Sequence, residues 1–310
     1  MPLEDTLSIP LGVSALILSW PGYEERALSI QESLVHAVDD LEVIHNSTSG
    51  SFLPNAQWTD LGPDAFFGRK FIHGISHDRL DIVLFIVADA QCDDWVGLVE
   101  QCRDVFSLGK NVGVWAPTCG GTPWRGDRTA LRAVRGAERL MVSTVVDSIV
   151  WAIRSDLIPE LRTFDYSTNT FGWGIETAVA CLAHSVGLKV VTDSHSIVHH
   201  PQGPSYDSQL AERQQQSFTE GLPSKLRFLA HGAARILYLE KRKEITDKTL
   251  ILSLRRFFWS TVYFLANSIG WFRKSARKTE SPPRQTADHS GTLRPNNFPA
   301  HQRSRAKEKG

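Results

Sequence analysis

The sequence has few cysteines, no excess of charge of either sign and no apolar run long enough to cross a membrane. Its 4 cysteines form no CxxC pair, which argues against a disulfide framework and predicts reduced thiols in a cytoplasmic setting. Equal numbers of basic and acidic residues, 34 of each, argue against nucleic acid as a partner. The apolar run 11–20 is too short to span a bilayer, and because no Lys or Arg precedes it, it is not a signal peptide.

Charge is nevertheless unevenly distributed along the chain. From residue 273 to the end there are 10 Lys or Arg against 3 Asp or Glu, which leaves 24 against 31 in residues 1–272. Residues 275–310 are rich in Pro, Ser, Asn, Arg and Lys and are expected to form a disordered basic tail. The remaining length is ample for a large core. We predict one domain over residues 1–219, followed by a helical extension over 220–274.

The first half of the chain alternates short apolar runs with segments of helical spacing. Four of the runs are predicted to be strands: residues 13–19, 41–45, 81–89 and 112–117. Helices are expected over 24–38 and 96–106. Two strands joined by a helix open a parallel sheet, in which ligands bind beyond the carboxyl ends of the strands. Tyr23 and Asn46, in the loops after the first two strands, are therefore candidate nucleotide contacts.

The second half continues in the same manner. Residues 142–153 are rich in β-branched residues and contain Asp147, residues 154–161 look helical, and residues 188–198 are predicted to be a strand. This strand leads to His199 and His200, which are either a metal ligand and its neighbour or a surface pair.

The run 81–89 shows the strongest strand pattern in the chain. Its near-continuous apolar character is typical of a central strand that is covered on both faces. Asp89 ends this run, and Asp93 and Asp94 follow closely. Carboxylate oxygens suit Mg²⁺ or Mn²⁺, and an ion that bridges two phosphates needs only one or two protein carboxylates. We expect Asp89 to bind such an ion, while Asp93 and Asp94 either assist it or cap the following helix.

Residues 164–176 hold the best candidate for a catalytic group. Polar, turn-forming residues lead into Gly172, Trp173 and Gly174, and Glu176 follows at the start of a predicted helix. The glycines allow a ligand to approach the backbone closely, and the Trp173 ring offers a face on which a sugar could stack. Glu176 is thus a candidate general base. The alternative is a carboxylate that only stabilises the helix N-terminus, beside a buried tryptophan.

The order of these motifs resembles the family 2 glycosyltransferases, inverting enzymes of the GT-A fold. The likeness spans about residues 11–206 and rests on five segments: residues 19–23, 45–50, 87–91, 172–176 and 198–205. It implies an α/β protein of GT-A type, with a Rossmann-like, mixed, mainly parallel sheet flanked by helices and a C-terminal helical extension. One departure concerns the metal-binding DxD motif. Val87 and Gln91 stand two residues on either side of Asp89, so only one carboxylate of the motif is present.

The resemblance also implies a reaction and a set of site residues. A sugar is transferred from a nucleotide-sugar donor to a hydroxyl of a glycan or lipid-linked acceptor, as in polysaccharide biosynthesis, with Glu176 as the base. A divalent metal, Mg²⁺ or Mn²⁺, assists. The donor site would use Pro21, Tyr23, Asn46 and Arg69, the metal would be held by Asp89 with His199 or His200, and the acceptor side would include Trp173, Asp147 and Asp165.

The C-terminal third suggests contact with a membrane surface. Residues 250–274 are largely apolar and aromatic, but Arg255 and Arg256 interrupt them, and the uninterrupted run 257–272 has 16 residues, short of the roughly 20 that span a bilayer. Aromatic and basic residues together favour an interfacial helix. The alternative is a helix packed on the core. Two other functions also remain open: a non-catalytic relative that binds nucleotide sugars or glycans, and a membrane-surface scaffold formed by residues 220–310.

Overall fold

A computed structural model describes residues 10–47, 54–107, 111–120, 129–200, 207–245 and 250–268. The side chains of residues 237–252 and 267–268 are not described. The predicted tail 275–310 lies outside the described residues, as do residues 48–50 and 201–205 of two predicted motifs.

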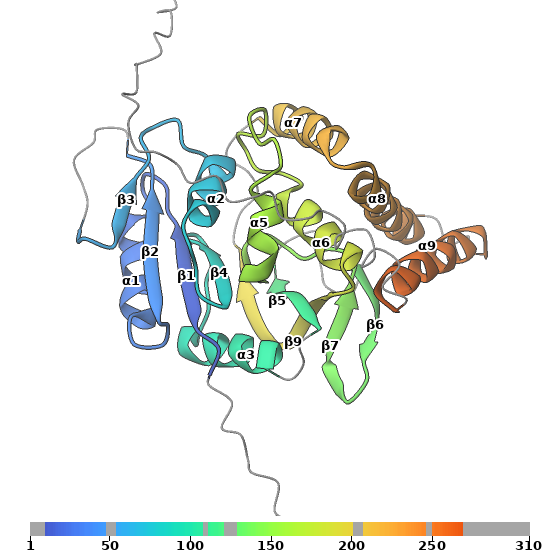
Figure 1. The fold of residues 1–310 in the computed structure, drawn as a ribbon, viewed down its shortest axis with the longest axis horizontal. Helices are drawn as coiled ribbons and strands as arrows, with labels where there is room; N and C mark the ends of the chain where they lie inside the picture. The colour runs from blue at the N-terminus through green and yellow to red at the C-terminus, as the bar shows by residue number, and fades with distance from the viewer. Residues whose placement is uncertain are drawn as a thin grey trace, which may run out of the picture.

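One mixed sheet with helices packed against it forms the centre of the molecule (Figure 1). Its strands are β1 (Val13–Leu18), β2 (Asp40–His45), β3 (Trp58–Asp60), β4 (Ile82–Val87), β5 (Val112–Gly120), β6 (Ala130–Val134), β7 (Ala137–Ser143), β8 (Val150–Arg154) and β9 (Lys189–His199). The helices are α1 (Glu24–Leu34), α2 (Phe67–Ser76), α3 (Trp95–Ser107), α5 (Ile158–Leu161), α6 (Ile175–Ser185), α7 (Ser208–Gly221), α8 (Ser224–Ile245) and α9 (Leu250–Ser268), with a 3₁₀ turn at Ser155–Leu157.

The strands lie in the order β3-β2-β1-β4-β8-β5-β9-β7-β6. The neighbours from β3 to β4 are parallel, and so are β5 and β9. Strand β8 is antiparallel to both β4 and β5, and the hairpin β6–β7 adds antiparallel strands beside β9. Every residue of β4 is buried, as its continuous apolar pattern predicted. The expected mixed α/β sheet is therefore confirmed.

One predicted helix is shorter in the structure, and one run without an assigned element contributes to two strands. The first helix ends at Leu34 instead of residue 38, and Asp39 instead accepts a hydrogen bond from the backbone N–H of Val13 at 2.9 Å. The β-branched run 142–153, to which no single element was assigned from the sequence, contributes to two strands. It divides into β7 and β8 around Asp147, whose Oδ1 accepts a hydrogen bond from the N–H of Ile149 at 3.2 Å, a side-chain turn that competes with strand pairing.

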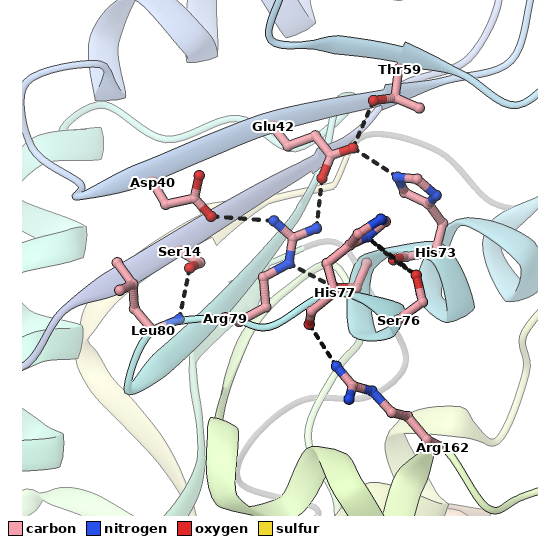
Figure 2. A network of polar contacts seen from close by, with 11 residues as sticks. Ser14, Asp40, Glu42, Thr59, His73, Ser76, His77, Arg79, Leu80 and Arg162 are labelled. Carbon is pink, nitrogen blue, oxygen red and sulfur yellow. Dashed lines mark hydrogen bonds and ion pairs between the residues drawn. The ribbon is translucent and has the colours of Figure 1, made fainter. Parts of the chain in front are cut away.

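Helix α2 is tied to the sheet by a polar network centred on Glu42 and Arg79 (Figure 2). Arg79 donates to Glu42 at 2.6 Å and to Asp40 at 3.2 Å, and Glu42 also contacts Thr59 at 2.7 Å and His73 at 2.8 Å. Burial works to raise the pKa of Glu42, but the hydrogen bonds from Arg79, Thr59 and His73 outweigh it, so the pKa is lowered. The network fixes the last turns of α2 and so holds its first turns beside the carboxyl edge of the sheet.

Helices α8 and α9 pack on α6 and share its apolar core. Tyr263 of α9 is fully buried, and its hydroxyl donates to the carbonyl of Leu229 in α8. Its ring lies edge-on to His184 of α6, with centroids 5.0 Å apart. For this face of α9 the structure therefore confirms the alternative stated above, a helix packed on the core. Within the described ranges, no helix has both the length and the apolar character needed to cross a membrane.

Candidate active site at the carboxyl edge of the sheet

Asp89 and His200 meet at the carboxyl ends of β4 and β9. The backbone of Gln91 pairs with that of His199, with N–O distances of 2.9 and 2.8 Å. This pairing brings the Nε2 atom of His200 to 3.0 Å from Oδ2 of Asp89. The hydrogen bond to Asp89 raises the pKa of His200, although burial works against it. His199 instead turns its ring over Gly120 and remains exposed, so His200 is the histidine that reaches Asp89.

This pair fits a divalent cation that takes some of its ligands from the protein and the others from the phosphates of a substrate. The second carboxylate oxygen of Asp89, Oδ1, is buried and has no hydrogen-bond partner among the described residues. An anionic oxygen in that condition is costly unless a cation or a donor reaches it. The described side chains form no cluster of three or more His, Cys, Asp or Glu that could hold a metal by itself. Mg²⁺ and Mn²⁺ sites that complete their shell with phosphate and water need only one or two protein ligands.

Glu176 lies in the first turn of α6, as predicted. The residue as a whole is half-buried, whereas its carboxyl group is desolvated by the surrounding protein. Desolvation by burial raises its pKa to about 7, and the charge of Asp147 raises it further, whereas hydrogen bonds from Thr177 and the helix backbone lower it. The Oγ1 of Thr177 lies 3.1 Å from Oε1 of Glu176. A carboxyl with a pKa near 7 can accept a proton at neutral pH.

Asp147 links the two halves of the site electrostatically. Its negative charge contributes to the raised pKa of both Glu176 and His200. The loop between β7 and β8 therefore lies near enough to the start of α6 and to the end of β9 for the charge of Asp147 to act on both. No local sequence pattern predicted this proximity, because the three segments are far apart in the chain.

The turn before Glu176 is held together by a buried asparagine that the sequence reasoning did not single out. Asn169 accepts a hydrogen bond from the N–H of Gly172 at 3.0 Å and donates to the carbonyl of Trp173 at 3.0 Å. Gly172 has φ +78°, and a Cβ there would lie 2.4 Å from the Phe67 ring. Only glycine fits this position. The turn therefore docks on the start of α2. The role of Asn169 had one signal in the sequence, its position three residues before a glycine.

The predicted donor residue Asn46 contacts a lysine that was also missed. Lys70 is fully buried, and its Nζ donates to Asn46 Oδ1 at 2.5 Å and to the carbonyl of Ser19. The same Nζ lies 4.3 Å from the centroid of the Trp20 ring. Burial lowers the pKa of Lys70 to about 7. Arg69, the neighbour chosen from the sequence, is exposed, because the phase of α2 turns Lys70 and not Arg69 towards the sheet.

Asp60 fixes the loop that contains Asn46. It ends β3, a strand that was not predicted, and accepts hydrogen bonds from the N–H and the hydroxyl of Ser47 at 2.9 and 2.5 Å. The N–H of Gly62 donates to it at 2.9 Å. The hydrogen bonds from Ser47 lower the pKa of Asp60. Asn46 is therefore held from two sides at the carboxyl end of β2.

Other predicted residues lie at the rim or outside the cluster. Pro21 is exposed and Tyr23 half-exposed, both in the turn between β1 and α1. Asp165 is exposed and accepts a hydrogen bond from the N–H of Ser167 at 2.9 Å, so it stabilises its own turn. Asp94 accepts from the N–H of Gly97 at 2.8 Å, which confirms the helix-capping alternative for this residue. Trp173 is half-buried.

Comparison with known proteins supports the architecture. No protein-family model and no curated protein sequence matches the chain. A crystal structure of GalNAc-T7 with UDP, GalNAc and Mn²⁺ is similar, with a TM-score of 0.50 and 13% identity over 85% of this chain. The fold is of the GT-A type. This chain spans 57% of the length of the GalNAc-T7 chain.

Two further similar structures have lower TM-scores. The mannosyltransferase PcManGT from Pyrobaculum calidifontis, in complex with GDP-Man and Mn²⁺, has a TM-score of 0.45 and 12% identity over 87% of both chains. Glucosyl-3-phosphoglycerate synthase from Mycobacterium tuberculosis, with Mn²⁺, UDP and phosphoglyceric acid, has a TM-score of 0.47 and 15% identity, over 69% of this chain and 80% of that chain.

Proposed function

We propose that this chain is a glycosyltransferase that moves a sugar from a nucleotide-sugar donor to a hydroxyl of a glycan or lipid-linked acceptor, with inversion at the anomeric carbon. The observation that carries the proposal is the grouping of Glu176, whose pKa is about 7, with the Asp89–His200 pair under the shared charge of Asp147. GalNAc-T7, which has a similar fold, was crystallised with UDP, GalNAc and Mn²⁺.

Glu176 acts as the general base in this proposal. The acceptor hydroxyl transfers its proton to the Glu176 carboxylate as its oxygen attacks the anomeric carbon of the donor. The bond between that carbon and the diphosphate breaks with both electrons going to the leaving oxygen, and attack from the opposite face inverts the configuration. Because the pKa is about 7, a large share of the carboxyl is ionised at neutral pH and is still basic enough to take the proton.

Asp89 and His200 would hold the divalent ion, Mg²⁺ or Mn²⁺. When bound, such an ion supplies positive charge that stabilises the departing diphosphate. Oδ1 of Asp89, which is buried and without a partner among the described residues, would bind the ion. Nε2 of His200 is already within 3.0 Å of Oδ2 of the same carboxylate. Arg69, exposed on α2, would add a further positive charge near the donor phosphates.

The donor nucleotide would bind along the ends of β1 and β2, beside Pro21, Tyr23 and Asn46. Lys70 acts as a positioning residue in this site. Its contact is with Oδ1 of Asn46, while among the described residues the Nδ2 group makes a single long bond, to the carbonyl of Pro63 at 3.5 Å. Nδ2 would therefore donate to a carbonyl oxygen of the base. On the acceptor side, Trp173 would stack on the sugar, with Asp147 beside Glu176 and Asp165 at the rim.

A donor screen followed by a turnover assay tests the proposal. Melting curves of the full chain would be recorded with a panel of nucleotide sugars, with and without Mn²⁺, because a bound donor stabilises the fold by mass action. The donor that raises the melting temperature would then be tested for release of nucleoside diphosphate, with and without candidate acceptors. Metal-dependent release that rises with an acceptor and that Glu176→Gln strongly reduces supports a transferase. Binding without hydrolysis or transfer would instead identify the non-catalytic relative.

A further inference from the structure

Helix α9 has two apolar faces, and within the part of the chain that the structure describes one of them is packed against the protein and the other is exposed. The inner face carries Tyr263 and Ala266, which are buried against α6 and α8. The outer face carries large apolar side chains that stay exposed: Leu254, Phe257 and Phe258, and then, seven residues after the two phenylalanines, Phe264 and Leu265. Spacing of this kind places them on one stripe along the helix. A helix that only closed the core would have a polar outer face.

The exposure of this stripe is large enough to need an explanation. Phe257 is 71% exposed, and Phe258 and Leu254 are each 59% exposed. Phe228 of α8, 52% exposed, extends the stripe, since its ring lies 5.4 Å from Trp259 and the Trp259 ring lies 5.5 Å from Phe258. Single exposed apolar residues are ordinary, but a contiguous aromatic patch marks a surface that is covered by something.

Positive charge flanks the stripe on both sides. Arg255 is exposed along one side. On the other, the Arg132 guanidinium of β6 lies 4.7 Å from the centroid of the Phe264 ring. The sequence of α9 contains no Asp or Glu, and none occurs in residues 224–236 of α8. Aromatic side chains bordered by arginines match the interface of an anionic bilayer, where rings enter the boundary of the acyl chains and guanidinium groups meet lipid phosphates.

We propose that the outer face of α9, with Phe228, binds an anionic lipid bilayer and holds the protein at the membrane surface. The helix lies at one end of the molecule, beside α8 and the β6 edge of the sheet (Figure 1). Beside it, a hollow of about 350 Å³ opens between Leu131, Val142, Phe257 and Phe264, which gives a lipid chain room between the hairpin and the helix.

Charge favours a lipid surface over a second copy of this chain. A two-fold contact through the stripe would bring the same patch of both copies together. The flanking arginines of one copy, Arg255 and Arg132, would then face those of the other, and like charges that face each other across a contact are unfavourable. Anionic lipid removes this repulsion.

Flotation of the full chain with vesicles tests the inference. We expect binding to vesicles of phosphatidylcholine with phosphatidylglycerol, weaker binding to phosphatidylcholine alone, and partial release by high salt. Alkaline carbonate should release the protein completely. The double variant Phe257→Ser/Phe258→Ser should weaken binding by at least about tenfold, because two rings lose their apolar burial in lipid. Arg255→Glu should weaken binding to the anionic vesicles only.

A matched control uses exposed apolar residues elsewhere. Val96→Ser/Leu210→Ser changes two such side chains, on α3 and α7, and should leave vesicle binding unchanged. Melting temperatures close to that of the wild type would show that all variants fold. Equal binding of the Phe257/Phe258 variant and the wild type would overturn the inference. So would a concentration-dependent dimer, seen by light scattering, that the same variant dissociates, since it would identify the stripe as a contact between copies.

Discussion

The Nε2 atom of His200 lies 3.0 Å from Oδ2 of Asp89, although 111 positions separate the two residues in the chain. The pairing of the Gln91 and His199 backbones creates this contact. The sequence lacks a second carboxylate two residues from Asp89, and the imidazole supplies a nitrogen at the same carboxylate from the end of β9. The proposed metal site is therefore assembled from two strand ends and not from one motif.

Asp89→Asn should remove metal-dependent binding of nucleoside diphosphate. Asparagine keeps the size of the side chain but loses the negative charge that a cation requires, so affinity in the presence of Mn²⁺ should fall at least about tenfold. Calorimetric titration of the diphosphate, with and without Mn²⁺, measures this. Asp94→Asn is the matched control, since that residue caps α3 and asparagine caps equally well. An Asp89→Asn affinity that still rises with Mn²⁺ would contradict the assignment.

Glu176→Gln should reduce sugar transfer by about 10²- to 10⁴-fold while donor affinity changes little, because glutamine cannot take the proton. The measurement is transfer at saturating donor, with donor binding measured separately. Glu160→Gln, at an exposed acid in the first turn of α5, should transfer normally. Transfer by Glu176→Gln at the wild-type rate would leave Glu176 as a carboxylate that only stabilises the helix.

The same Glu176→Gln variant should be more thermostable than the wild type at alkaline pH. Burial raises the folded-state pKa of Glu176 from 4.5 to about 7, so the stability present below the unfolded pKa is lost as the pH rises through 7. Glutamine carries no charge at any pH, so the variant keeps this stability at alkaline pH. Melting temperatures should differ at pH 8 and converge near pH 4. A variant that is less stable at pH 8 would show that the charged form is favoured by the fold.

Asp147→Asn should shift the pH profile of transfer to lower pH. For the wild type, kcat/KM should rise with pH and level off above about 7, following ionisation of Glu176. Removing the charge of Asp147 lowers the pKa of Glu176, so the rise should occur earlier. Asparagine can still accept the hydrogen bond from Ile149, which preserves the loop. An unchanged profile would mean that Asp147 does not act on the base.

Lys70→Met should weaken donor binding by about tenfold or more without abolishing folding. The substitution removes the Nζ donor from Asn46 and Ser19, and each such hydrogen bond is worth about 0.5–1.5 kcal/mol, or more in the fraction of molecules in which Nζ is charged. Lys189→Met, at a half-buried lysine that begins β9, is the control and should bind donor normally. The loss should appear in donor affinity and not in turnover at saturating donor. A selective loss of turnover would assign Lys70 to the chemistry instead.

Much of the architecture could be predicted from local patterns. The continuous apolar run of β4 indicated a central strand, and the acid that follows it indicated Asp89 at the ligand edge. Gly172, Gly174 and Glu176 predicted a tight turn into a helix, and the structure has one. The hairpin β6–β7 and the short strand β3 were missed, because polar residues interrupt their apolar patterns.

The sequence by itself determined the strands β1, β2, β4, β5 and β9 and the turn before α6, with the carboxylates that follow β4 and this turn, since hydrophobic periodicity and glycine geometry act over a few residues. Only the tertiary structure decided that Lys70 and not Arg69 faces the sheet, that His200 and not His199 reaches Asp89, and that Asp147 acts on Glu176. Each of these depends on contacts between distant segments. A one-residue difference in helix phase, or in the position at which two strand ends pair, changes which side chain enters the site, and local composition does not encode that choice.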